Sequence, residues 1–120
     1  MRDWTFEQLQ EHMHRKSADG GWWDDLTPAN ETFFIATKLG LIMSEAAEAF
    51  SGYRTGTKDK HLPHRDELEV ELADLVIRAM DLAEFMGYDL VGTMQEKDEY
   101  NARRADFKVA RTGAAGSKKF

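Results

Sequence analysis

The chain has 120 residues, 42% hydrophobic and 32% charged, a balance that is typical of a folded globular protein rather than a disordered one. Its net charge of −6 argues against a nucleic-acid partner, because general duplex binding needs a basic face to neutralise phosphates. Because the sequence has no cysteine, no long apolar run and no apolar leader, we expect a soluble, cytoplasmic protein without disulfides, thiolate metal sites or a membrane partner.

Four helices are predicted in chain order. Thr5 and Gln8 have the spacing of a capping box at the start of the first helix, and a loop rich in glycine and aspartate follows this helix. Gly87 is a natural stop for the third helix, and Asp89 is a natural N-cap for the fourth. The predicted helices extend approximately over residues 5–17, 28–53, 64–86 and 89–111.

Four helices with short connections predict an all-α, four-helix-bundle-like fold. We expect a single domain over residues 1–111 and a mobile tail over residues 112–120. The second helix is apolar around most of its circumference and the third carries two apolar stripes, so several neighbouring helices must cover them. We therefore expect these helices to be shared across a homodimer or a homotetramer.

Four carboxylates interrupt the two apolar helices at a spacing of three residues: Glu45 and Glu48 in the second helix, Glu71 and Asp74 in the third. Residues three apart share a helix face, so the four carboxylates converge if the helices are neighbours. Two such charges about 5 Å apart repel by roughly 3 kcal/mol, which protonation or a cation must relieve. An all-oxygen ligand set suits Mg²⁺, with Mn²⁺ as a substitute. The alternative is a solvated acidic face.

Other side chains are candidates for contacts with an anionic ligand. Lys97, Asn101 and Arg104 share one stripe of the fourth helix, and lysine and arginine are both common phosphate ligands. Lys38 of the second helix is a further candidate, with a solvent-exposed role as the alternative. Trp22 of the first loop is a candidate for stacking on a nucleobase, and a cover for the end of the bundle is the alternative.

The two acidic elements together resemble the signature of the MazG-like all-α nucleotide pyrophosphohydrolases. That signature joins an ExxE element to an ExxD element, which here are Glu45-Ala-Ala-Glu48 and Glu71-Leu-Ala-Asp74. The resemblance covers most of the chain and is closest to the short phage-type or integron-type members. The chain departs from many relatives in having Ser44 where they have another glutamate before the first ligand.

The resemblance implies a Mg²⁺-dependent hydrolysis of a ribo- or deoxyribonucleoside triphosphate to the monophosphate and pyrophosphate. It implies that the four carboxylates hold the metal, that Glu45 or Glu48 activates the attacking water, and that the basic stripe of the fourth helix contacts the phosphates. Phosphoribosyl-ATP or a nucleoside diphosphate as substrate, and a non-enzymatic oligomerisation module, are the alternatives. A ferritin-like di-iron oxidase is not expected, because no Glu-x-x-His element occurs and the four histidines are expected at the surface.

Overall fold

A computed structural model describes residues 1–104 of the chain. Within this range the secondary structure consists of four helices and no strand: α1 (Phe6–Asp19), α2 (Glu31–Thr55), α3 (Glu67–Phe85) and α4 (Leu90–Arg103). The predicted all-α class is therefore confirmed. The chain divides into two compact units, of which the first is Met1–Tyr88 and the second begins at Asp89. Each of the helices in residues 1–104 is too short or too polar to reach across a lipid bilayer.

Local capping groups place three of the helix boundaries where the sequence predicts them. The Gln8 backbone N–H donates to Thr5 Oγ1 at 3.1 Å, and the Thr5 N–H donates to Gln8 Oε1 at 2.8 Å, which completes the capping box of α1. Gly87 follows the end of α3 with a positive φ of 71°, a conformation that favours glycine. The Asp89 side chain caps α4 by accepting a hydrogen bond from a backbone N–H in its first turn.

The fourth helix is shorter than predicted. α4 ends at Arg103 rather than near Arg111, because Arg104 has an extended backbone with φ −67° and ψ 139°. Residues 105–111 of the predicted helix and the predicted mobile tail over residues 112–120 lie outside the described residues. The single domain over residues 1–111 stays a prediction.

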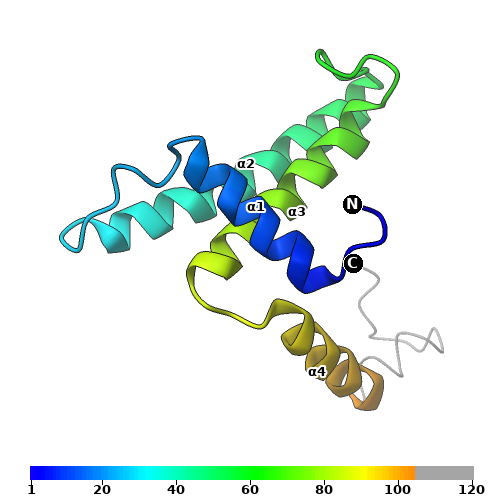
Figure 1. The fold of residues 1–120 in the computed structure, drawn as a ribbon. Helices are drawn as coiled ribbons and strands as arrows, with labels where there is room; N and C mark the ends of the chain where they lie inside the picture. Colours follow the sequence, from blue (N-terminus) through cyan, green and yellow to red (C-terminus); the bar gives the residue numbers. More distant parts are fainter. Residues whose placement is uncertain (105–120) are drawn as a thin grey trace. The chain divides into compact units, whose positions relative to one another are not determined.

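In the first unit, α2 and α3 lie side by side and α1 packs against α3 (Figure 1). The loop between α2 and α3 reverses the chain, so the end of α2 meets the start of α3. Gly52 allows a close approach at this point, because a Cβ atom there would lie only 2.8 Å from the Cγ atom of Glu67. This contact places the second half of α2, which carries the ExxE element, beside the first half of α3, which carries ExxD.

The buried apolar core of the first unit is small and is centred on Trp23. The Trp23 ring stacks on Phe85, with ring centroids 4.2 Å apart and planes inclined by 15°. It also lies against Phe34 of α2, at a centroid distance of 5.5 Å. Trp23 is therefore a core residue that joins the first loop to α2 and α3. The other buried apolar residues are Ala49, Met80 and Ala83.

Large apolar side chains remain exposed along α2. Leu39, Met43, Phe50 and Tyr53 follow one another at helical spacings and lie on one face of α2, and we call them the α2 apolar stripe. Met43 is 72% exposed and Phe50 is 66% exposed. A continuous row of this kind differs from the scattered apolar residues that are normal on protein surfaces. The stripe is a candidate contact surface.

Candidate functional site

Three of the four predicted carboxylates meet between α2 and α3. One oxygen atom from each of Glu45, Glu71 and Asp74 lies within 4.8 Å of the other two. Glu45 and Glu71 are buried, at 6% and 9% exposure, and Asp74 is half-buried. Glu71 and Asp74 share a face of α3 because they are three residues apart, and Glu45 approaches them from α2. Small side-chain movements would bring the three oxygens to a common cation.

Glu48, the fourth predicted carboxylate, lies at the solvent side of this group. It is exposed, yet it lies within hydrogen-bonding reach of both Glu45 and Glu71. Its carboxylate is not part of the group of three whose oxygens all lie within 4.8 Å of one another. The structure thus brings together all four predicted carboxylates, which we call the acid cluster: Glu45, Glu48, Glu71 and Asp74.

The acid cluster surrounds Glu71 with other carboxylates. Hydrogen bonding with Glu45, burial, and the nearby Glu48 raise the pKa of Glu71 from 4.5 to about 8. Among the described residues, Glu71 Oε2 is buried without a hydrogen-bond partner, which is a costly arrangement for a carboxylate. Burial and the nearby Glu45 also raise the pKa of Asp74. A shared proton or a bound cation would relieve both groups.

Arg78 is a site residue that the sequence analysis did not identify. It lies on α3 one turn after Asp74, and its Nε donates a hydrogen bond to Glu45 Oε1 at 2.7 Å. Burial works to raise the pKa of Glu45, but hydrogen bonds with Glu71 and Arg78 hold it below its ordinary value. Because Arg78 is four residues after Asp74, its position on the acidic face of α3 was readable from the sequence.

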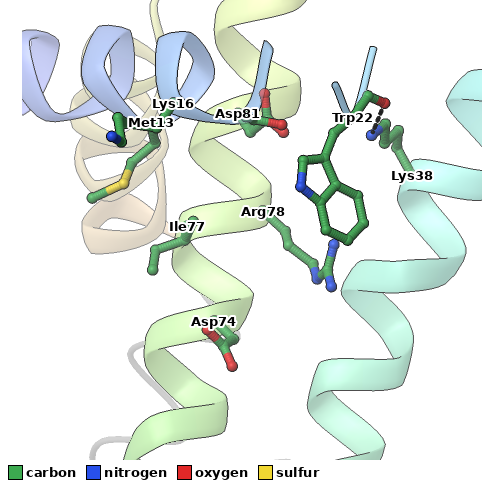
Figure 2. Close-up of a pocket in the computed structure, with 9 residues that line it drawn as sticks. Met13, Lys16, Trp22, Lys38, Asp74, Ile77, Arg78 and Asp81 are labelled. Atoms are coloured by element: carbon green, nitrogen blue, oxygen red, sulfur yellow. Dashed lines mark hydrogen bonds between the residues drawn. The ribbon is translucent and has the colours of Figure 1, made fainter. Parts of the chain in front are cut away.

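A cavity of about 320 Å³ adjoins the acid cluster and opens beside Trp22 (Figure 2). Both Asp74, which belongs to the acid cluster, and Arg78, which donates to Glu45 of the cluster, line the cavity. Figure 2 shows the Trp22 ring between α2 and α3, with the Arg78 guanidinium extending toward it. Trp22 is 57% exposed, so much of its side chain is accessible to a ligand. The cavity is lined by Met13, Lys16, Ser17, Trp22, Lys38, Asp74, Ile77, Arg78 and Asp81.

Lys38 is buried, and its ammonium group already has partners. Its Nζ donates a hydrogen bond to the Trp22 carbonyl oxygen at 3.0 Å, and it lies 4.5 Å from the Trp23 ring centroid. Burial lowers the pKa of Lys38, and Asp81 acts in the opposite direction. These contacts tie the first loop to α2. The predicted contact between Lys38 and phosphate stays a prediction.

A second buried carboxylate lies on α3 near the same cavity. Asp81 Oδ1 accepts a hydrogen bond from Trp23 Nε1 at 3.0 Å and lies 2.7 Å from His14 Nδ1. The expectation that His14 lies at the surface is wrong, because its half-buried ring packs edge-on against Trp23 at a centroid distance of 5.3 Å. We call His14, Trp23 and Asp81 the Asp81 network.

The three predicted phosphate contacts near the C-terminal end of the described residues belong to the second compact unit. Lys97 and Asn101 lie on α4, and Arg104 is its C-cap residue. The Lys97 Nζ lies 4.7 Å from the Tyr100 ring centroid, and the Arg104 guanidinium carbon lies 6.0 Å from the same centroid. The approach of these side chains to the acid cluster stays a prediction.

Comparisons of the chain with models of protein families, with curated proteins and with solved structures give no match. The interpretation of the site therefore depends on its own geometry, namely the acid cluster, the arginine beside it and the cavity. The resemblance of the two acidic elements to the MazG-like signature remains a sequence argument.

Proposed function

We propose that the protein is a Mg²⁺-dependent nucleoside-triphosphate pyrophosphohydrolase with a MazG-like fold. The acid cluster is the observation that carries this proposal. Carboxylates this close repel by roughly 3 kcal/mol per ionised pair at an effective dielectric constant of 20. That repulsion is large beside a total stability of about 5–15 kcal/mol, which favours a ligand-binding role for the cluster over a purely structural one.

The donor atoms of the cluster fit a hard divalent cation. Glu45, Glu71 and Asp74 offer only carboxylate oxygens, which is the ligand type that Mg²⁺ and Mn²⁺ prefer. The buried Glu71 Oε2, without a hydrogen-bond partner among the described residues, is a ready ligand atom. The four carboxylates of the acid cluster would hold the cation. When bound, it would offset triphosphate charge and lower the pKa of a water molecule.

We assign proton transfer and phosphate binding to particular side chains. Glu48 is exposed beside the buried carboxylates, so it is better placed than Glu45 to take the proton of the water that attacks the α-phosphorus. Glu45 is less suited because its carboxylate is buried beside Glu71 and Asp74. The bond between the α-phosphorus and the α–β bridging oxygen breaks, which releases a nucleoside monophosphate and pyrophosphate. We assign the phosphate contacts to Lys97, Asn101 and Arg104.

The cavity beside Trp22 is our candidate site for the nucleobase. Its volume of about 320 Å³ is within the usual range of small-molecule sites, although near its lower end. The exposed Trp22 ring offers a stacking surface that accepts every base. Because Asp74 lines this cavity and also belongs to the acid cluster, a base placed there keeps the attached triphosphate close to the carboxylates.

The α2 apolar stripe supports a homodimer or a homotetramer in which helices of the first unit are shared. Its four large side chains are exposed in the single chain, whereas few apolar residues of the first unit are buried. A second copy of the chain covering this stripe would remove that apolar surface from water. Light scattering coupled to size-exclusion chromatography measures the mass directly, and a monomeric mass would contradict this part of the proposal.

A panel of nucleotides with Mg²⁺ tests the proposed reaction. We expect the common ribo- and deoxyribonucleoside triphosphates to give monophosphate and pyrophosphate, measured by chromatography and by separate assays for pyrophosphate and orthophosphate. Nucleoside diphosphates and phosphoribosyl-ATP in the same panel test the alternative substrates. Release of orthophosphate would show that a bond other than the one between the α- and β-phosphates is cleaved. Absence of turnover, together with no thermal stabilisation by Mg²⁺ and a non-hydrolysable triphosphate, would favour the oligomerisation module.

A further inference from the structure

The Arg78 guanidinium occupies the position of a counter-ion in the acid cluster. Its Nε donates to Glu45 Oε1 at 2.7 Å, and the Glu45 carboxylate is almost completely buried. A charge-assisted hydrogen bond of this length is strong. Among the described residues, it is the only ion pair that involves the cluster. The positive charge of Arg78 therefore offsets only part of the negative charge of the cluster.

A divalent cation at the same carboxylates would change this arrangement. A cation bound to Glu45, Glu71 and Asp74 would place two positive charges close to the guanidinium, and like charges at short range repel. The Glu45 carboxylate would also have to serve both cations. Arg78 and a divalent cation therefore compete for the Glu45 carboxylate.

The cavity offers Arg78 a second set of contacts. The side chain is half-buried and lines the cavity, and its guanidinium carbon lies 5.7 Å from the Trp22 ring centroid. Figure 2 shows the guanidinium extending toward the Trp22 ring from α3. A guanidinium stacks on aromatic faces and presents a planar fork of donors to phosphate. A short movement away from Glu45 would leave it in a suitable place for an anionic ligand.

We propose that Arg78 is an internal counter-ion that a divalent cation displaces from Glu45, and that the released guanidinium then contacts the phosphates of the substrate. The displacement concerns the metal alone, whereas the contact with phosphates rests on the proposed function. The consequence is a fixed order of binding: the cation binds first, and the arginine then becomes available to the substrate. Arg78 is thus assigned as a substrate-binding residue with a second role in controlling metal affinity.

Replacement of Arg78 by methionine tests the displacement, with Mn²⁺ as the probe and calorimetry as the measurement, on the full chain without nucleotide. We expect Arg78→Met to bind Mn²⁺ roughly tenfold more tightly than the natural chain, because no charge-assisted hydrogen bond has to be broken. Arg54→Met is the matched control, because the Arg54 guanidinium carbon also lies 5.7 Å from an aromatic ring, that of Phe50. It has no hydrogen bond to the acid cluster, so its Mn²⁺ affinity should stay within about twofold of the natural chain.

Equal or weaker Mn²⁺ binding by Arg78→Met would overturn the displacement. If circular dichroism shows that this variant does not fold, Arg78→Lys takes its place. Lysine keeps the charge but loses the planar N–H donor, so we expect an affinity between those of the natural chain and of a chain without the charge. Unchanged or weaker binding by Arg78→Lys would likewise contradict the proposal.

Steady-state kinetics at saturating Mn²⁺ test the contact with phosphates. We expect Arg78→Met to raise the KM for the nucleotide about tenfold, while kcat changes less than about threefold. Tighter Mn²⁺ binding with an unchanged KM would retain the displacement and exclude the phosphate contact. If the natural chain hydrolyses no nucleotide, the proposed function fails, and the Mn²⁺ titration still decides whether Arg78 is displaced.

Discussion

Asp74 and Asp81 lie two turns apart on α3 and line the same cavity, but their surroundings differ. Asp81 receives a hydrogen bond from Trp23 and lies beside His14, so donors surround its carboxylate. Asp74 lies beside Glu45 and Glu71, so other carboxylates surround it. The difference shows that burial alone does not assign a role to an acidic residue. The number of donors around a carboxylate distinguishes a structural acid from one that is available to a cation.

The same comparison separates stability from activity. The Asp81 network joins α1, the first loop and α3, and it satisfies its buried polar atoms. The acid cluster joins α2 and α3 but leaves Glu71 Oε2 without a hydrogen-bond partner in the part of the chain that the structure describes. Removal of a carboxylate should therefore destabilise the protein at the Asp81 network and should inactivate it at the acid cluster.

The largest expected effect is on activity at the acid cluster. Asp74→Asn should lower Mg²⁺-dependent nucleotide hydrolysis by roughly a hundredfold or more, because it removes a metal-binding charge. Its melting temperature without metal should be unchanged or higher, since burial and the nearby Glu45 already disfavour the ionised Asp74. Initial rates and thermal melts measure the two effects. Asp19→Asn, at an exposed position, is the control, and near-normal activity of Asp74→Asn would remove Asp74 from the site.

The second prediction concerns the pH dependence of the metal-free protein. Because the pKa of Glu71 rises from 4.5 to about 8, the folded state keeps a proton that the unfolded state releases. The free energy of unfolding should therefore fall as the pH rises from about 4.5 to 8, by an amount on the order of a few kcal/mol. Glu71→Gln keeps a hydrogen-bond donor but has no ionisable group at this position. The free energy of unfolding of this variant should therefore lose the pH dependence that Glu71 causes.

Urea unfolding in the presence of a chelator, at several pH values across this range, measures the effect. Parallel pH curves for the natural chain and Glu71→Gln would contradict the assignment of the pH dependence to Glu71. Binding of Mg²⁺ should also release a proton below pH 8, and its affinity should rise with pH up to that value. Calorimetry in buffers with different ionisation enthalpies detects the released proton.

The smallest expected effect on metal binding is at the Asp81 network. Asp81→Ala should lower the free energy of unfolding by about 2 kcal/mol, because it leaves the buried Trp23 N–H without its acceptor. Its Mn²⁺ affinity should stay within about threefold of the natural chain. Urea unfolding and calorimetry measure these quantities. A stable Asp81→Ala variant with weak Mn²⁺ binding would reverse the comparison between the two groups of acids.

Features that depend on residues close in sequence were predictable. The capping box at Thr5, the stop at Gly87 and the N-cap at Asp89 each involve a few neighbouring residues, and the structure shows all three. The pairs of carboxylates also followed from helical spacing, since three residues return a side chain to the same face. The convergence of the two pairs depended on α2 and α3 being neighbours, and the two helices are in contact.

Features that depend on the packing of distant segments were not predictable. His14 and Asp81 meet because α1 packs against α3, and no local pattern marks this pair. Arg78 was on the correct face of α3, but its choice of Glu45 as partner depends on the approach of α2. The hydrogen bond from Lys38 Nζ to the Trp22 carbonyl oxygen likewise depends on the fold of the first loop, which no local pattern indicates.

The position of Trp22 has a consequence for the entropy of ligand binding. Its carbonyl oxygen is held by a buried lysine, while its ring remains exposed at the cavity. The backbone of this residue is thus restrained before any ligand arrives, and only the rotation of one ring is left to be restricted. If a nucleobase stacks there as proposed, a platform ordered in advance would reduce the conformational freedom that association removes, so more of the stacking energy would contribute to affinity.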